Sequence, residues 1–177
     1  MLVKLIGLAL CSILASSAMA QNRAVPQPAV HAAAATAPPD ASILVGKWTY
    51  RSYVNTTALV GDDKDKALAI IFGEGIYSID PLSGTALTGT LDMGGGYVLD
   101  LKGTVTQTAP PSVAISGYGR AGTPTAGWEY DYNASLAYQW PNGVDQLPAL
   151  VGSVIRAKPH DGGAAGVVAS FIAVKQQ

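Results

Sequence analysis

The sequence predicts an all-β protein whose eight antiparallel strands follow one another in an up-and-down barrel. Three observations favour this fold class: apolar and polar residues alternate with a period of two, turn-forming residues separate the alternating segments, and charged residues make up only 13% of the chain. Closing eight strands into a barrel removes the two exposed edges that an open sheet would have. A two-sheet β-sandwich is the alternative that the pattern leaves open.

Eight segments carry strand character, and all of them lie beyond residue 43. Their expected ranges are 44–55, 68–79, 85–93, 97–107, 112–121, 128–140, 149–158 and 166–175. The separators are rich in Gly, Pro, Asn and Asp, which supply the φ angles that tight turns require. The first gap is longer, and its charged cluster at 62–66 is expected to begin a short helix that continues through Ala67 and Leu68.

The sixth segment shows the alternation most clearly. One face carries only apolar and aromatic residues, and the other carries mainly polar ones. The residues of the apolar face are Trp128, Tyr130, Tyr132, Ala134, Leu136, Tyr138 and Trp140. A helix would mix the two sets, so this segment is predicted to be a strand with one buried face.

Composition excludes several classes of protein. The 177 residues suit one domain, and a net charge of -1 does not provide the cationic surface that a nucleic-acid-binding protein needs. The only cysteine is Cys11, so a Cys-His metal site is not expected. The aspartates at 62, 63 and 65 lack the glycine and the terminal glutamate of a calcium-binding loop, and a solvated loop is expected there. We expect neither a metal nor a cofactor.

The N-terminal region predicts export. A basic residue, Lys4, precedes the apolar run 5–15, and the chain then reaches an A-x-A cleavage pattern that ends at Ala20. We therefore expect residues 1–20 to be a signal peptide and the protein to be secreted or periplasmic, without a membrane anchor. Residues 21–43 are rich in Ala and Pro and are predicted to be a disordered tether in which His31 is exposed to solvent.

The start of the first strand resembles that of the calycin barrels, which include the lipocalins and the avidins. The shared residues are Gly46 and Trp48, in a Gly-x-Trp pattern at the beginning of the first of eight strands. The resemblance implies that Trp48 closes one end of the barrel and is packed by a basic side chain from the last strand, for which Lys175 is the candidate, with Arg156 one strand earlier. The polar residues that hold biotin in avidins are replaced here by residues 49–51, Thr-Tyr-Arg, which argues against biotin as the ligand.

An aromatic row provides the candidate ligand-binding residues. Aromatic walls bury flat apolar ligands, and hydroxyl and indole groups orient them, although the same residues could also fill a solid core. The candidates are Trp48, Tyr50, Trp128, Tyr130, Tyr132, Tyr138 and Trp140, with Arg51 and Arg120 as cations that pair with Glu74 or with a ligand carboxylate.

The sequence also offers a candidate for acid-base chemistry. Glu74 shares the strand parity of Ile70, Phe72 and Ile76, so it is expected to point inward, where burial would raise its pKa. The alternative is that Glu74 pairs with an inward arginine or lies at a bulge. His160 lies in the turn Pro-His-Asp-Gly-Gly at 159–163 and is expected to be a hydrated turn residue rather than part of a catalytic relay.

One further motif, Gly-x-Gly-x-x-Gly at 117–122, fits the dinucleotide-binding pattern in spacing. That fingerprint requires a helix directly after the third glycine, whereas Thr-Pro-Thr-Ala-Gly follows here. A strand end and a turn are therefore expected at 117–122.

These observations predict an exported barrel that binds a small, largely apolar or aromatic molecule without catalysing a reaction. Two other functions stay open: a small barrel isomerase or cyclase that uses Glu74, and a solid barrel that acts as an interaction or accessory module. Nucleic acid is not an expected partner, whereas a homo-oligomer or a protein partner stays open.

Overall fold

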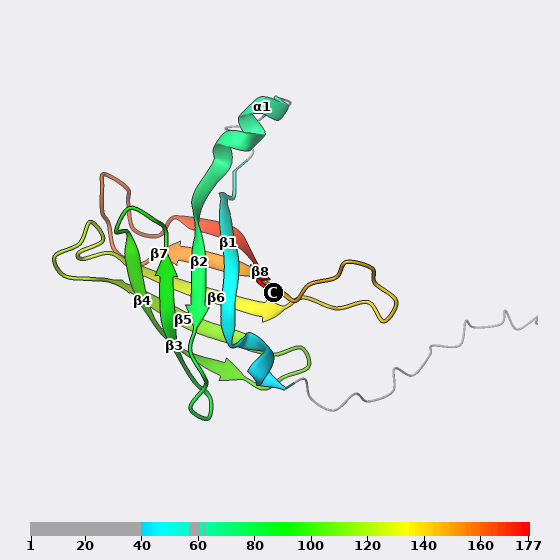
Figure 1. The fold of residues 1–177 in the computed structure, drawn as a ribbon. Helices are drawn as coiled ribbons and strands as arrows, with labels where there is room; N and C mark the ends of the chain where they lie inside the picture. Colours follow the sequence, from blue (N-terminus) through cyan, green and yellow to red (C-terminus); the bar gives the residue numbers. More distant parts are fainter. Residues whose placement is uncertain (1–39, 57–60, 62) are drawn as a thin grey trace, which may run out of the picture. The chain divides into compact units, whose positions relative to one another are not determined.

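The computed structural model of the chain describes residues 40–56, 61 and 63–177. Within this part of the chain, eight antiparallel strands form a closed barrel in which each strand pairs with the next and the eighth pairs with the first (Figure 1). The predicted fold class is confirmed, and the β-sandwich alternative is wrong. The predicted signal peptide and the predicted tether up to residue 39, which includes His31, lie outside the described residues.

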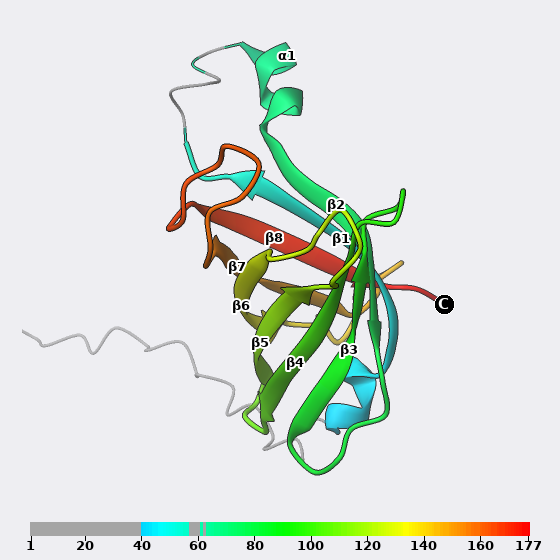
Figure 2. The ribbon, with the colours of Figure 1, turned by 90° about the vertical axis from the view of Figure 1, so that its left-hand side faces the viewer.

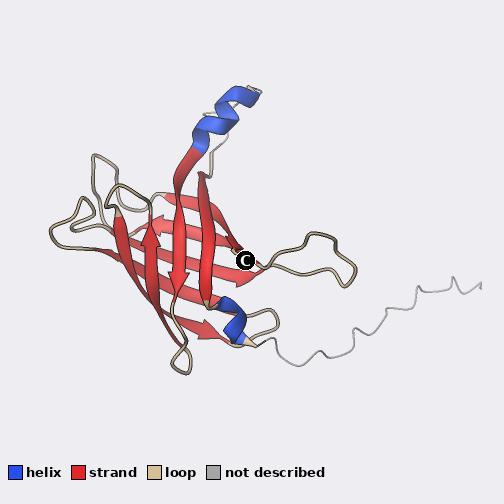
Figure 3. Ribbon diagram, viewed as in Figure 1, coloured by secondary structure: helices blue, strands red, loops and turns tan. Residues whose placement is uncertain are grey.

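In the residues that the structure describes, helical structure is confined to short segments outside the barrel wall (Figure 3). The strands are β1 (Gly46–Val54), β2 (Ile71–Ile79), β3 (Ala86–Asp92), β4 (Val98–Thr106), β5 (Ser112–Gly119), β6 (Glu129–Leu136), β7 (Ala149–Arg156) and β8 (Val168–Lys175). The helical segments are the 3-10 turns η1 (Ala41–Leu44) and η2 (Leu68–Ile70) and the single helical turn α1 (Lys64–Ala67). The expected short helix before the second strand is confirmed, as is the strand end and turn after Gly117. No helix in the described part of the chain has the length and apolar character needed to cross a membrane.

The up-and-down order places the connecting loops alternately at the two ends of the barrel. We call the end at which β1 begins and β8 ends the closed end; it carries the loops 80–85, 107–111 and 137–148. The opposite end, which we call the open end, carries the loops 93–97, 120–128 and 157–167 and the connection from β1 to β2, which contains α1 and η2. The open end lies at the left in Figure 1, and Figure 2 turns it toward the viewer.

The closed end is sealed by Trp48 and by the 3-10 turn η1. Trp48 is fully buried, and its indole Nε1 donates a hydrogen bond to the carbonyl of Leu44 at 2.9 Å. The Lys175 ammonium donates to the carbonyl of Ile43 at 2.5 Å and lies 5.5 Å from the centroid of the Trp48 ring. The closure implied by the calycin resemblance, a tryptophan packed by a basic residue of the last strand, is therefore present.

Because of η1, the folded part of the chain begins earlier in the sequence than predicted. Residues 41–43 were predicted to belong to the disordered tether, but they form the first part of η1, and Ala41 is buried. The cause is local. The Asp40 carboxylate accepts hydrogen bonds from the backbone N–H and the hydroxyl of Ser42, which caps the turn, and the apolar residues that follow can then pack against the barrel. The tether prediction is wrong for these three residues.

The middle of the barrel is filled by side chains from alternate positions of every strand. Four aromatic rings meet there with centroid separations between 4.9 and 6.4 Å, mostly edge to face, and they belong to Tyr50, Tyr77, Tyr132 and Phe171. Leucines of β3 and β4 pack beside them. The aromatic row therefore supplies part of a solid core, and what remains of the interior lies toward the open end.

Candidate ligand-binding pocket

A pocket of about 260 Å³ occupies the half of the barrel that faces the open end. Its lining combines apolar side chains, such as Leu91, Leu99 and Val154, with aromatic rings and a few polar groups. Ligand sites in proteins have this composition: a mostly apolar wall with a small number of placed polar groups. The interior of this barrel is therefore hollow at one end and filled at the other.

The aromatic wall is built by side chains from β6 and from strands and loops around it. Trp128 precedes β6 and contacts Tyr97 and Tyr130, with ring centroids 5.7 and 6.3 Å away. Phe72 of β2 meets Tyr130 edge to face at 6.1 Å. Tyr132 and Tyr50 form the inner limit of the pocket, where it meets the solid core. These rings offer flat and edge contacts to an aromatic ligand.

His160 covers one side of this wall, although the turn that holds it was predicted to be hydrated. Its imidazole stacks on Trp128, with centroids 3.9 Å apart and an interplanar angle of 18°, and its side chain is only 9% exposed. A 2.6 Å hydrogen bond joins its Nε2 to the hydroxyl of Tyr130. The prediction of a solvated histidine is wrong, because Trp128 and Tyr130 bury a residue that is distant from them in the sequence.

The turn around His160 is held by its own backbone. His160 and Gly163 exchange N–H to carbonyl hydrogen bonds of 3.2 and 2.8 Å, and Asp161 and Gly162 both adopt positive φ between them. Burial, and then the positive charge of Arg156, hold the pKa of His160 below its ordinary value of 6.5. The imidazole is therefore neutral at pH 7.

Arg156 brings a positive charge to the pocket from the last position of β7. Its guanidinium carbon lies 5.4 Å from the centroid of the Phe72 ring, and Nη1 donates a long 3.4 Å hydrogen bond to the carbonyl of Ala164. Its Nε is buried and makes no hydrogen bond within the described residues. Gly163 provides the space for the guanidinium, because a Cβ at that position would overlap it.

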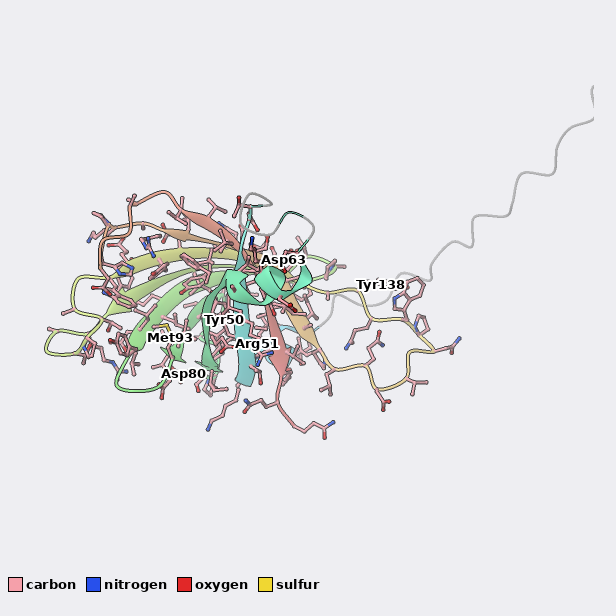
Figure 4. All side chains as sticks on the ribbon, turned by 90° about the horizontal axis from the view of Figure 1, so that it is seen from above. Tyr50, Arg51, Asp63, Asp80, Met93 and Tyr138 are labelled. Atoms are coloured by element: carbon pink, nitrogen blue, oxygen red, sulfur yellow. The ribbon has the colours of Figure 1, made fainter. Side chains whose placement is uncertain are left out.

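Of the seven aromatic residues predicted to bind a ligand, four line this pocket, namely Tyr50, Trp128, Tyr130 and Tyr132. The other three do not. Trp48 closes the other end of the barrel, while Tyr138 and Trp140 lie in the loop 137–148 and are 68% and 70% exposed. Figure 4 shows Tyr138 on this loop, well away from Tyr50. The sixth strand was predicted to reach residue 140, but β6 ends at Leu136. The apolar residues that continue the alternation beyond Leu136 therefore belong to no strand and are not buried by the sheet.

The predicted inward position of Glu74 is wrong. Glu74 lies on the outer face, where its Oε1 is 2.7 Å from Nε of Arg51, and both side chains are about half exposed. A bulge explains the error: Ser52 pairs with Gly73 and Tyr53 with Ile71, so Phe72 is an extra residue. Phe72 therefore lines the pocket although it shares the sequence parity of Glu74. The alternative, a pairing with an inward arginine or a position at a bulge, is only partly right, because the arginine partner lies on the outer face and the bulge is at Phe72.

Arg120, the other predicted cation, also lies outside the pocket. It pairs with Asp100 at 2.7 Å, and both side chains are exposed. The ion pair lowers the pKa of Asp100, mainly through the hydrogen bond from the guanidinium. Neither predicted cation faces the interior, and Arg156 takes that place.

Sequence reasoning did not select several pocket residues, chiefly Phe72, Tyr97, Arg156 and His160. A signal for Arg156 was present in the sequence, because it has the same strand parity as Leu150 and Val154, whose side chains are buried in the barrel. An arginine at an inward parity near a strand end is a candidate for a pocket cation. The position of His160 had no comparable local signal.

Comparison of the chain with known protein families, with curated proteins and with solved structures finds no match. Within the residues that the structure describes, no group of three or more His, Cys, Asp or Glu side chains is placed to hold a metal ion. The function is therefore inferred from the chemistry of the pocket.

Proposed function

We propose that this protein binds a small, largely apolar molecule that contains an aromatic ring, in the pocket at the open end of the barrel, without catalysing a reaction. The observation that carries the proposal is the contrast between the two halves of the barrel. Trp48 and η1 seal one end over a packed core, whereas the other end holds a space of about 260 Å³ between aromatic walls. The interior of an eight-stranded barrel is wide enough either to be filled by side chains or to hold one small ligand.

The size of the pocket supports a compact ligand. Sites for drug-sized molecules usually occupy about 300 to 1,000 Å³, so 260 Å³ suits one or two fused rings better than a long acyl chain. A flat ring placed near Trp128, Tyr130 and Phe72 would make face and edge contacts with all three side chains. Such contacts add to the free energy that burial of apolar surface provides.

We propose that the chain is a calycin-type barrel, because the Gly-x-Trp start, the preceding 3-10 turn and the Lys175 contact to the Trp48 ring all lie at the same end. A ligand then enters from the opposite end. We also propose that the protein is secreted or periplasmic, which the signal-like pattern of residues 1–20 supports.

One observation favours a second function, interaction with a partner. The loop 137–148 projects Tyr138 and Trp140 into solvent, edge to face at 5.3 Å, and Gln146 fixes its conformation through two hydrogen bonds to the Trp140 backbone. Exposed aromatic residues on an ordered loop are typical of interaction surfaces. The isomerase or cyclase alternative has lost its proposed acid, because Glu74 lies outside the barrel.

Ligand binding can be tested with a neutral bicyclic probe and a variant that fills the pocket. Gly73 lines the pocket, and a Cβ there lies at ordinary contact distance from Ser52 and Tyr50, so Gly73→Leu should fold and occupy the space. We expect 2-naphthamide at millimolar concentration to raise the Tm of the wild type, because it binds the folded state only, and to leave the Tm of Gly73→Leu unchanged.

The matched control is Glu74→Gln, which changes the neighbouring residue on the outer face of the same strand. Its Tm should respond to 2-naphthamide as the wild type does. A wild type that shows no rise in Tm, or an equal rise in Gly73→Leu, would overturn the proposal of a ligand pocket.

A further inference from the structure

Three polar side chains of the pocket are gathered near its mouth, where the exposed Asp161 also contributes to the lining, whereas Ser52 lies deeper, beside Tyr50. Tyr130 of β6, Arg156 of β7 and His160 of the following loop all line the pocket, and the Tyr130 hydroxyl is hydrogen-bonded to His160. Hydrogen bonding and the charge of Arg156 act to lower the pKa of Tyr130, against a larger increase caused by burial. The remaining lining is mostly apolar. A ligand in this pocket therefore meets one polar corner and an apolar remainder.

The guanidinium of Arg156 has few hydrogen-bond partners within the described part of the protein. In the described part of the chain it forms no ion pair, its Nε makes no hydrogen bond, and its Nη1 donates a long 3.4 Å hydrogen bond to Ala164; its other polar contact is with the neutral hydroxyl of Tyr130. Arg156 is partly buried, and a cation that has lost part of its hydration is normally paired or fully hydrogen-bonded, because that loss is costly otherwise. The ring of Phe72 beneath the guanidinium offsets part of this cost, but it does not provide an acceptor for the N–H groups.

His160 adds a second unpartnered group. Its side chain is nine-tenths buried, and its Nδ1 makes no hydrogen bond to the described residues, although an oxygen of the exposed Asp161 carboxylate lies 3.6 Å away. The imidazole is neutral at pH 7, so the guanidinium is the positive charge of this corner, and the nearest negative charge faces solvent.

We propose that the ligand carries a carboxylate, bound by Arg156 with Tyr130 and His160 beside it, while its aromatic ring occupies the apolar part of the pocket. This inference rests on the proposed function of the pocket. A carboxylate supplies the acceptor oxygens that a guanidinium fork matches, and it is the anionic partner that the described residues do not provide. The ligand class is thus a small aromatic carboxylic acid in its ionised form.

The experiment compares 2-naphthoate with 2-naphthamide, which has nearly the same shape and no charge, by isothermal titration calorimetry at pH 7.5. We expect the wild type to bind naphthoate at least about tenfold more tightly than naphthamide, as a charge-assisted hydrogen bond predicts. Arg156→Gln should lower the affinity for naphthoate by about tenfold or more and leave the affinity for naphthamide nearly unchanged.

The matched control is Lys158→Gln, which removes an exposed cation two residues away that pairs with Glu129. It should leave both affinities unchanged.

Gly163→Ala provides a second test. It keeps every charge of the protein, but the added methyl group would displace the guanidinium. This variant should also weaken the binding of naphthoate more than that of naphthamide.

Three results would overturn the inference. The first is equal affinity of the wild type for the two probes, and the second is an equal loss of affinity for both probes in Arg156→Gln. Either result would exclude a carboxylate site, but the binding of naphthamide would still support the ligand pocket. If the wild type bound neither probe, the pocket proposal and the carboxylate inference would fail together.

Discussion

Buried titratable side chains in this barrel owe their chemistry to neighbours from distant parts of the chain. Tyr77 and Tyr132 are buried in the ring cluster, and burial raises the pKa of both phenols well above the ordinary value of 10.0. His160 shows the opposite shift, because burial disfavours a charged imidazole as it disfavours a charged phenolate. In each residue the neutral form is stabilised at physiological pH.

The lowered pKa of His160 predicts how stability changes with pH. In the unfolded chain the imidazole has its ordinary pKa of 6.5, whereas in the folded protein the pKa is lower. Between these two values the unfolded state binds more protons, so the free energy of unfolding decreases as the pH falls below about 6.5. Above that pH both states carry a neutral imidazole, and this contribution does not vary.

Urea denaturation at pH 7.5 and at pH 5 tests this prediction. The wild type should lose more stability between these two pH values than His160→Gln, which has no imidazole to titrate. Asp40 and Asp100 also have lowered pKa values, but their contributions are lost only below about pH 4, where the unfolded carboxylates take up protons. Equal losses in the two proteins would contradict the assignment to His160.

At the scale of elements, the short turn η1 is part of the barrel rather than a leader to it. Leu44 is fully buried, and its carbonyl accepts the hydrogen bond of the Trp48 indole. Lys175 of β8 joins the same turn through the carbonyl of Ile43. One element of four residues thus connects the first and the last strand at the closed end.

We expect Leu44→Ala to lower the free energy of unfolding by about 2–5 kcal/mol, because it removes a buried side chain and leaves a cavity beneath Trp48. Urea denaturation measures this loss. Val45→Ala, at the adjacent and only partly buried position, is the control and should cost less. Binding of 2-naphthamide should persist in both variants, since the pocket lies at the other end. A loss below about 1 kcal/mol for Leu44→Ala would show that η1 is not part of the cooperative core.

For the molecule as a whole, closure of eight strands depends on close approach of backbones at glycines. A Cβ at Gly103 of β4 would overlap the carbonyl oxygen of Ala114 on β5. At Gly73 of β2, by contrast, a Cβ meets Ser52 and Tyr50 at ordinary distances of 3.4 and 3.8 Å. The two positions are both glycines in strands of the same barrel, but only Gly103 has no room for a side chain.

Gly103→Ala is therefore expected to destabilise the barrel by about 1–3 kcal/mol, since the β4–β5 pair must separate or bend to accept the methyl group. Gly73→Ala is the matched variant, and it should leave stability unchanged or raise it slightly, because alanine reduces the entropy of the unfolded chain. Thermal and urea denaturation of both variants measure these changes in stability. Similar losses at the two positions would contradict the role of strand spacing at Gly103.

The sequence by itself determined the barrel class, the approximate strands and the inward face of β6. It could do so because period-two alternation is a local property of the chain, and each turn is encoded by the residues within it. The same local pattern selected Tyr50, Trp128, Tyr130 and Tyr132, which line the pocket. It failed for Glu74, since one extra residue in a strand pair reverses the facing of all residues beyond it.

Only the tertiary structure decided how the interior is divided between core and pocket. Whether a row of aromatic rings fills a barrel or lines a space depends on the side chains that all eight strands send to each level, and no single segment contains that information. The same reason applies to His160 and Arg156. Their positions follow from contacts with Trp128, Tyr130 and Phe72, which belong to other parts of the chain and come together only when the barrel closes.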